Sequence, residues 1–293
     1  MNPTALSPTT VQELLAAATR RLSIAGLERP ALEATALACH CLGLDKASLL
    51  AHPERPVDLE HARRCVELIE RRAGFEPLAY ITGEREFYGR SFAVDRRVMI
   101  PRPETELLVE TALEELRKEP PEAWIVDVGT GSGCVAATLA LEVPAAQIVA
   151  ADVSAAALEV ARRNVERHGL SGRVRLVRGN LLGWLQPGSG NRGVIVVANL
   201  PYIPAEAFDA LPPDVRRFEP RLALDGGPGG TRLLAELLEQ ASELGVGLLL
   251  AELDPRHADV VQAMAQRCFP DQPVAVLPDL AGHPRLLRAG RAR

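Results

Sequence analysis

The stretch Asp127-Val128-Gly129-Thr130-Gly131-Ser132-Gly133 decides the fold of this chain. It follows a short apolar run at 124–128 and precedes an apolar segment of helical character at 135–141. Glycines between a strand and a helix let the backbone approach a ligand where a side chain would block it. A glycine triplet also occurs in plain tight turns, so its meaning depends on the segments around it.

Those segments alternate between strand and helix. We expect strands at 124–128, 147–152, 173–177, 194–198 and 246–251, and helices at 135–141, 155–168 and 231–243. The segments 273–277 and 285–288 are expected to complete the edge of the sheet. This alternation predicts an α/β fold, a Rossmann-like parallel sheet covered by helices on both faces.

The N-terminal part of the chain has a different pattern. Between residues 9 and 72 the apolar residues recur at helical spacing, with breaks at Gly26, Gly43 and 53–56. This predicts a small all-helical domain over 1–74. Residues 75–100 carry short aromatic or β-branched runs typical of a hairpin or linker, namely Tyr80-Ile81, Phe87-Tyr88 and Phe92-Ala93-Val94. The third domain then covers 101–293.

The third domain opens with Pro101-Arg102-Pro103-Glu104-Thr105-Glu106. Pro103 in the first helical turn removes no intrahelical hydrogen bond, and the glutamates are favourable at the positive end of the helix dipole. The segment therefore predicts the start of a helix.

Composition limits the classes of protein that this chain can represent. The net charge of −5 gives no overall basic surface for nucleic acid, so we expect no stable binding of RNA or DNA. The five cysteines form no CxxC pair and have no histidine cluster at zinc-ligand spacing, so we expect thiols in a reducing compartment and no metal. No run of about 18 apolar residues occurs. We expect a soluble, cytoplasmic monomer without membrane contact.

The glycine loop favours S-adenosylmethionine over a dinucleotide. Cys134 occupies the position where the dinucleotide motif needs Gly or Ala, and the chain has no P-loop lysine. S-adenosylmethionine has no pyrophosphate and needs room for its methionine tail and a partner for its ribose. Asp152 ends the next strand and could accept the ribose hydroxyls, or it could cap the helix that follows. Asn180 and Leu181 follow the third strand and could hold the adenine, or form a turn. The predicted cofactor residues are Gly129, Thr130, Gly131, Ser132, Gly133, Asp152, Asn180, Leu181 and Asn199.

The fourth strand ends in Asn199-Leu200-Pro201-Tyr202, at the same edge of the sheet as the glycine loop. A planar amino group is a poor nucleophile because its lone pair is delocalised, so an enzyme must orient that lone pair toward the methyl group. The Asn199 side-chain oxygen and the Leu200 carbonyl can each accept one N–H, and Tyr202 can stack on the planar group. Pro201 biases Leu200 toward an extended conformation. These four residues are the predicted catalytic residues; a turn with a buried tyrosine is the alternative.

Together, the segment 101–106, the glycine loop, Asp152 and the Asn199 tetrapeptide resemble the bacterial release-factor glutamine N5-methyltransferases. The joint Glu76-Pro77-Leu78-Ala79-Tyr80-Ile81-Thr82-Gly83, followed by Glu86-Phe87-Tyr88-Gly89, carries the resemblance into the N-terminal half. The resemblance implies a class I S-adenosylmethionine-dependent domain over 101–293. It also implies methyl transfer to the glutamine of the Gly-Gly-Gln motif in peptide chain release factors, which the helical domain reads.

The chain departs from this family at several positions. Leu200 stands where the family has proline, and Gly229-Gly230-Thr231 replaces Asp-Gly-Leu. Asp254 and His257 replace a glycine and a glutamine. Two alternatives therefore stay open: an adenine-N6 methyltransferase acting on RNA or DNA, which should carry a basic cleft, and a catalytically silent binding homologue.

Overall fold

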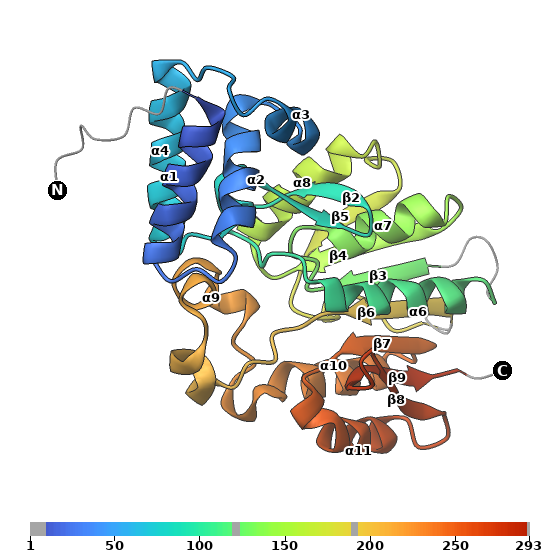
Figure 1. The fold of residues 1–293 in the computed structure, drawn as a ribbon. Coiled ribbons are helices and arrows are strands. Elements are labelled where there is room, and N and C mark those ends of the chain that lie inside the picture. Colours follow the sequence, from blue (N-terminus) through green and yellow to red (C-terminus); the bar gives the residue numbers. More distant parts are fainter. Residues whose placement is uncertain (1–9, 119–123, 189–192, 292–293) are drawn as a thin grey trace. The chain divides into compact units, whose positions relative to one another are not determined.

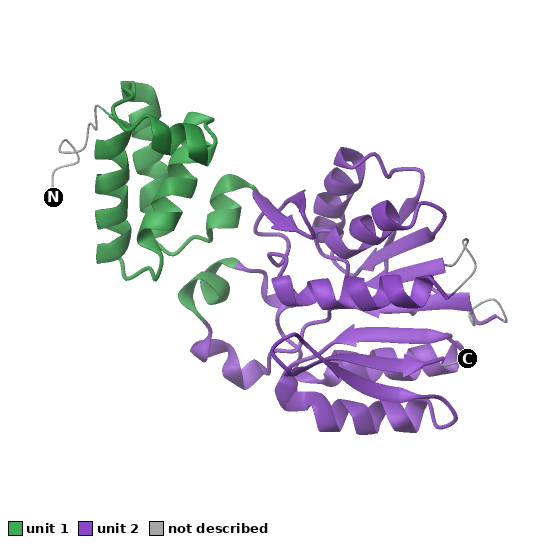
Figure 2. Ribbon diagram, turned by 45° about the vertical axis from the view of Figure 1, so that its right-hand side comes forward, with its two compact units in different colours: residues 1–83, 212–218 green, residues 84–211, 219–293 purple. Residues whose placement is uncertain are grey.

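The computed structural model describes residues 10–118, 124–188 and 193–291. The ends of the predicted domains 1–74 and 101–293, and two short internal stretches, lie outside the described residues. The chain divides into two compact units, residues 1–83 with 212–218 and residues 84–211 with 219–293 (Figure 2).

The first unit consists of helices. They are α1 (Val11–Ile24), α2 (Pro30–Leu42), α3 (Lys46–Ala51), α4 (Leu59–Ala73), α5 (Leu78–Thr82) and α9 (Pro213–Phe218). The apolar stripes predicted from the sequence form its core, with Leu14, Leu22 and Leu37 almost fully buried. The expectation that Tyr80-Ile81 belongs to a hairpin or linker is wrong, because both residues lie in α5 and bury their side chains there. Two aromatic or β-branched residues fit a single helical turn as readily as a strand.

A disulfide in the helical unit corrects a second expectation. Cys41 of α2 and Cys65 of α4 are bonded, with 5.7 Å between their Cα atoms. The two residues are 24 positions apart in the sequence, so only the packing of α2 on α4 brings them together. Cys39, Cys134 and Cys268 are free thiols.

The second unit begins with a hairpin of β1 (Glu84–Phe87) and β2 (Arg90–Ala93). Its two-residue turn, Tyr88-Gly89, has positive φ at both residues, which matches the right-handed twist of the strands. The Tyr88 N–H donates to the Glu106 carboxylate at 2.9 Å, which holds this non-glycine residue in its turn conformation. A short 3₁₀ turn, Pro103–Thr105, and α6 (Glu106–Leu116) then begin at the expected proline-rich segment.

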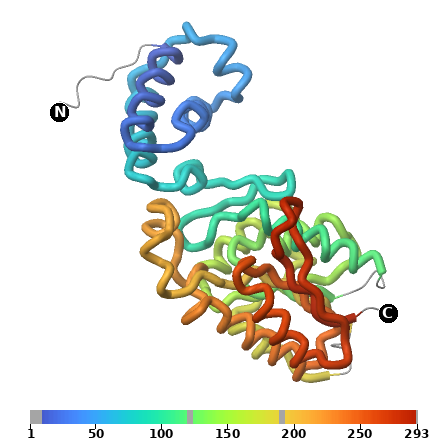
Figure 3. The backbone as a smooth tube through the Cα atoms, turned by 60° about the horizontal axis from the view of Figure 1, so that its bottom comes forward, coloured from blue at the N-terminus to red at the C-terminus, as the bar shows by residue number. Residues whose placement is uncertain are grey.

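The remaining chain builds a seven-stranded sheet in the order β5-β4-β3-β6-β7-β9-β8 (Figure 1). Its strands are β3 (Trp124–Val128), β4 (Gln147–Asp152), β5 (Val174–Arg178), β6 (Val194–Ala198), β7 (Leu248–Glu252), β8 (Val274–Pro278) and β9 (Pro284–Gly290). The first five are mutually parallel, whereas β9 pairs antiparallel with both β7 and β8. The tube in Figure 3 shows β8 and β9 as a hairpin near the C-terminal end. The predicted Rossmann-like α/β sheet is thus confirmed.

Helices cover both faces of this sheet. One core contains residues of α6, α7 (Cys134–Glu142) and the C-terminal part of α8 (Ala155–Arg167), and the other contains residues of α10 (Arg232–Glu243) and α11 (Ala258–Cys268). Ile125 of β3 faces the first core and Val126 the second, as expected for a strand that is buried on both sides. Helix α11 was not expected from the sequence. The carboxyl ends of β3, β4, β5, β6 and β7 share one edge of the sheet, where ligands bind in such folds.

Candidate active site

The glycine loop, residues 129–133, leaves β3 and leads into α7. Gly129, Gly131 and Gly133 all have positive φ, a backbone conformation that side chains rarely allow. The buried Asp127 carboxylate holds the loop by accepting from Thr130 Oγ1 at 2.6 Å and from the Ala136 N–H at 3.2 Å. Burial away from water raises the pKa of Asp127 to about 7. The loop is therefore shaped by its own glycines and by a carboxyl group from the strand before it.

Asp152, at the end of β4, supports the same loop from the neighbouring strand. Its carboxylate accepts from the Gly131 N–H at 2.9 Å and from the Ser154 N–H at 2.8 Å. Ser154 caps α8, because its hydroxyl accepts from the Ala157 N–H. The helix-cap alternative for Asp152 is thus wrong. Burial raises the pKa of Asp152, while the two backbone donors act in the opposite direction.

Asn180 and Leu181 lie in the loop after β5, the strand that pairs with β4 on the side away from β3. Leu181 has a positive φ of 46° and a buried side chain. Asn180 Nδ2 lies 3.5 Å from Glu236 Oε1, and the Leu182 N–H donates to Gln240 Oε1 at 2.8 Å. Side chains of α10 therefore hold this loop in place.

Asn199, which is partly buried, belongs to a chain of polar side chains from three segments whose other members, Thr105 and Glu252, are buried. Its Nδ2 donates to Thr105 Oγ1 at 2.9 Å, and Thr105 Oγ1 donates to Glu252 Oε2 at 2.7 Å. With the single hydroxyl proton of Thr105 directed at Glu252, the Thr105 oxygen accepts from Asn199. This order fixes the orientation of the Asn199 amide and leaves Oδ1 as the acceptor available to a ligand.

Glu252, at the carboxyl end of β7, is the final acceptor in this series of hydrogen bonds. Only 3% of the residue is exposed, and burial raises its pKa. Its second oxygen, Oε1, lies 3.4 Å from the Tyr202 hydroxyl, which donates to it. Glu252 therefore connects both ends of the predicted catalytic tetrapeptide. Neither Thr105 nor Glu252 was among the residues predicted for the site, although the position of Glu252 at the carboxyl end of a parallel strand is a signal for it.

Leu200 and Pro201 follow Asn199 directly after the end of β6. A methyl group added at Gly129 would lie 3.1 Å from Leu200 Cδ2, so the leucine that replaces the family's proline packs against the glycine loop. The tetrapeptide is braced from the other side by residues 224–230, through a bridge between Ile203 and Asp225. A side chain at Gly226 would meet Pro201 O at 2.8 Å, and one at Gly230 would meet Tyr202 O at 2.3 Å. Glycine is thus required at both positions for this close approach.

The two remaining departures from the family are Asp254 and His257, in the segment after β7. A Cβ atom added at Gly230 would lie 2.8 Å from His257 Cε1, so His257 packs directly against residues 224–230. The Asp254 carboxylate pairs with Arg256, with a shortest distance of 2.7 Å, and this contact lowers the pKa of Asp254. Asp254 therefore stabilises the turn after β7 through a neighbour in the sequence.

A cavity of about 480 Å³ joins these parts. Ten of the predicted site residues line it: Gly129, Thr130, Gly131, Ser132, Asp152, Asn180, Leu181, Asn199, Leu200 and Pro201. Gly133 and Tyr202 do not line it. Gly133 instead lets α8 approach, since a side chain there would lie 3.2 Å from Ala161 Cβ. Further lining residues that the sequence did not indicate come from 97–101 and 220–236, such as Arg97, Met99 and Leu222.

The described part of the chain gives two further observations about ligands and membranes. Within 10–118, 124–188 and 193–291, no group of three or more His, Cys, Asp or Glu side chains could hold a metal ion. Among the same residues, no helix has both the length and the apolar character needed to span a bilayer.

Comparisons with known proteins agree with this arrangement of fold and cavity. Residues 13–83 match a family described as the PrmC N-terminal domain, and residues 125–218 match a methyltransferase domain. Among solved structures, the hMettl16 catalytic domain bound to an RNA hairpin superimposes with a TM-score of 0.55 at 15% identity, covering 78% of this chain and 83% of that one. The human methyltransferase 10 domain containing protein gives a TM-score of 0.52 at 16% identity over 71% of this chain and 92% of that one. At these identities the solved structures support the fold alone, which is that of the class I methyltransferases.

Curated relatives narrow the class to a family. The release factor glutamine methyltransferase of Nitratidesulfovibrio vulgaris is 41% identical over 99% of this chain and 98% of its own length. The protein of the same name from Moorella thermoacetica is 42% identical over 96% of this chain and 99% of its own. This chain belongs to the release factor glutamine methyltransferase family.

Proposed function

We propose that this protein transfers the methyl group of S-adenosylmethionine to the side-chain amide nitrogen of a glutamine in peptide chain release factors. The observation that carries the proposal is the orientation of Asn199. Its Nδ2 is committed to Thr105, which leaves Oδ1 as an acceptor on a side chain that lines the cavity. An acceptor at this place suits a primary amide, whose nitrogen carries two N–H donors.

The residues around the cavity fit S-adenosylmethionine as the donor. The glycine loop offers backbone without side chains, and Asp152 keeps a carboxylate at the wall where ribose hydroxyls need an acceptor. In our proposal Thr130, Ser132 and Gly133 complete this loop, while Asn180 and Leu181 hold the adenine. When bound, the donor supplies an electrophilic methyl group on a sulfonium. Nothing in this chemistry requires a metal ion.

The chain's own residues prepare the acceptor amide for the reaction. The lone pair of an amide nitrogen is delocalised into its carbonyl group, so attack requires that nitrogen to be held with its lone pair toward the methyl carbon. Asn199 Oδ1 and the Leu200 carbonyl each accept one N–H of the glutamine, which fixes that orientation. Pro201 favours the extended conformation of Leu200 that this role needs. The amide proton leaves after methyl transfer, so no general base acts first.

Tyr202 has a double role in this proposal. Its hydroxyl is held by Glu252 at 3.4 Å, and its ring, which does not line the cavity itself, offers the glutamine amide a planar surface next to Pro201 at the cavity wall. Burial beside Glu252 raises the pKa of Tyr202, which keeps its hydroxyl protonated as a donor. Tyr202 therefore acts as a fixed surface and takes no part in proton transfer.

The substrate is the glutamine of the Gly-Gly-Gln motif in the release factor, and the helical unit of residues 1–83 reads the factor. We further propose that the protein acts as a cytoplasmic monomer. The net charge of −5 agrees with a protein partner and disfavours a stable complex with nucleic acid.

The test offers the protein two classes of acceptor with the same labelled donor. Purified release factor and unmodified ribosomal RNA are each incubated with S-adenosylmethionine that carries a labelled methyl group. We expect label on the release factor and none after its Gly-Gly-Gln glutamine is replaced by alanine. Label on the RNA alone would identify an adenine methyltransferase, and no label on either acceptor, with donor binding intact, would favour a silent homologue.

A further inference from the structure

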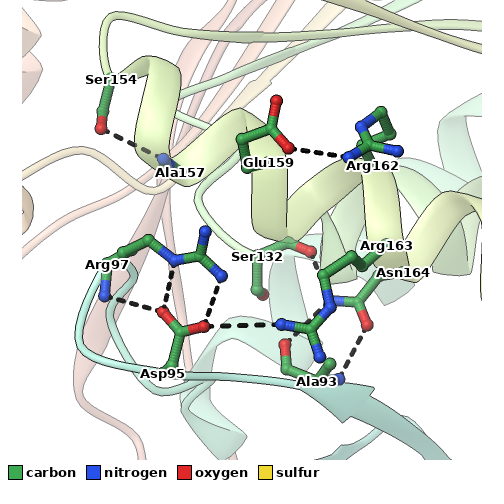
Figure 4. Close-up of polar contacts among 10 residues, drawn as sticks. All are labelled: Ala93, Asp95, Arg97, Ser132, Ser154, Ala157, Glu159, Arg162, Arg163 and Asn164. Atoms are coloured by element: carbon green, nitrogen blue, oxygen red, sulfur yellow. Dashed lines mark hydrogen bonds and ion pairs between the residues drawn. The ribbon is translucent and has the colours of Figure 1, made fainter.

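Asn164 of α8 holds three backbone groups of two other segments with a single side chain (Figure 4). Its Oδ1 accepts from the Ala93 N–H at 2.7 Å. Its Nδ2 donates to the Ala93 carbonyl at 2.9 Å and to the Ser132 carbonyl at 2.8 Å. The amide thus satisfies both polar groups of Ala93 as a neighbouring strand would, and it also reaches the glycine loop.

The two residues that Asn164 bonds, Ala93 and Ser132, belong to segments that line the cavity. Ser132 lines the cavity and lies in the glycine loop. Ala93 ends β2, and the chain that follows it supplies the cavity residues Arg97, Val98 and Met99. Asn164 therefore connects two walls of the cavity that are separated by about 40 positions in the sequence.

The segment after Ala93 is also held from the outside. Asp95 binds the Arg97 guanidinium through two side-chain hydrogen bonds of 2.8 and 2.6 Å, and Arg163 of α8 lies 3.6 Å from the same carboxylate (Figure 4). These groups are partly exposed, so their contribution is screened by solvent. Asn164 is fully buried, so solvent does not screen its hydrogen bonds in the folded protein.

We infer that Asn164 is a positioning residue for the methyl donor, acting through Ser132 and through the segment that begins at Ala93. The inference rests on the proposed function only in assuming that S-adenosylmethionine binds this cavity. Asn164 lines no part of the cavity, so its effect passes entirely through the backbone groups that it holds. The residue should influence donor affinity and leave the orientation of the acceptor, which depends on Asn199, unchanged.

The decisive measurement is the Kd for S-adenosylmethionine by calorimetry, without any acceptor. Asn164→Ala removes all three hydrogen bonds, and Asn164→Asp keeps the size and the acceptor but loses both donated bonds. We expect Kd to rise about tenfold in each variant, as the loss of buried hydrogen bonds implies. Turnover at saturating donor and KM for the release factor should change by less than about threefold.

The matched control is Arg162→Ala on the same helix. Arg162 is half exposed and bonds Glu159 and Glu166 of α8 itself, so its loss should leave Kd within about twofold. A wild-type protein that fails to bind the donor would overturn the proposed function. Normal binding by the wild type together with an unchanged Kd in the Asn164 variants would overturn only the inference.

A second measurement needs no variant and remains valid if the Asn164 substitutions prevent folding. Because Ala93 donates to Asn164, donor binding that orders the glycine loop should also slow amide hydrogen exchange at Ala93. We expect at least about fivefold slower exchange at Ala93 on addition of S-adenosylmethionine. Unchanged exchange at that amide would contradict the coupling.

Discussion

The proposed donor side and the proposed acceptor side of the cavity are built in different ways. On the donor side, the glycine loop is held by bonds of short sequence separation, 3 positions from Asp127 to Thr130 and 21 from Gly131 to Asp152, and by a longer one through Asn164, which is 32 positions from Ser132. On the acceptor side, Asn199 and Thr105 are 94 positions apart, and Thr105 and Glu252 are 147 apart.

The two sides also present different chemical groups. The donor side offers backbone held in place by carboxylates, whereas the acceptor side depends on the orientation of one side-chain amide. Backbone that loses a single support is displaced only in part, because neighbouring residues still restrain it. A side chain whose orientation depends on one hydrogen bond loses that orientation when the bond is removed. Substitutions on the acceptor side should therefore reduce turnover, and those on the donor side should reduce affinity.

The largest effect should follow removal of the acceptor-orienting group. We expect Asn199→Ala to lower kcat about 1,000-fold, because the glutamine amide loses the partner that fixes its lone pair. Kd for S-adenosylmethionine should stay within about threefold. Initial rates at saturating donor, together with calorimetric donor binding, measure the two quantities. Wild-type turnover in this variant would remove Asn199 from the site.

A smaller loss should follow when only the orientation of Asn199 is disturbed. Thr105→Val keeps the shape of the side chain but leaves Asn199 Nδ2 without its acceptor, so we expect kcat to fall about 30-fold. Thr105→Ser restores the hydroxyl and should recover most of that loss. Equal rates in the valine and serine variants would show that the hydroxyl is not what matters.

On the donor side, Asp152→Asn should raise Kd for S-adenosylmethionine about tenfold with little change in kcat. The amide loses the charge that strengthens the bonds from Gly131 and Ser154, and it offers one acceptor oxygen in place of two. Equilibrium dialysis with labelled donor provides the measurement. A selective fall in kcat would mean that the two sides are not separable.

The smallest effect concerns stability and pH. The pKa of Asp127 is raised from 3.8 to about 7, so the folded state binds its proton more tightly than the unfolded state does. The contribution of Asp127 to stability is therefore fully present below pH 3.8 and is lost as the pH rises through about 7. In donor-free urea unfolding, Asp127→Asn should flatten this pH dependence. An identical pH profile in the variant would contradict the assignment.

Prediction from sequence succeeded where one segment carries its own signal. The strands 124–128, 147–152 and 194–198 match β3, β4 and β6, because short apolar runs that contain β-branched residues and are bounded by breaks leave little choice. It failed at Tyr80-Ile81, where a short apolar run fits either structure, and it missed α11. The disulfide between Cys41 and Cys65 was equally out of reach, since it depends on the packing of two helices.

By itself the sequence determined the parallel sheet, the glycine loop after β3 and the edge where the site lies, because each follows from local patterns and from the direction of parallel strands. It also indicated Asp152 and Asn199 as the polar groups that end two of those strands. Only the tertiary structure decided which way the Asn199 amide faces, through Thr105 and Glu252, and which two walls Asn164 joins. Such contacts depend on three-dimensional proximity between distant segments, for which no spacing along the chain provides a signal.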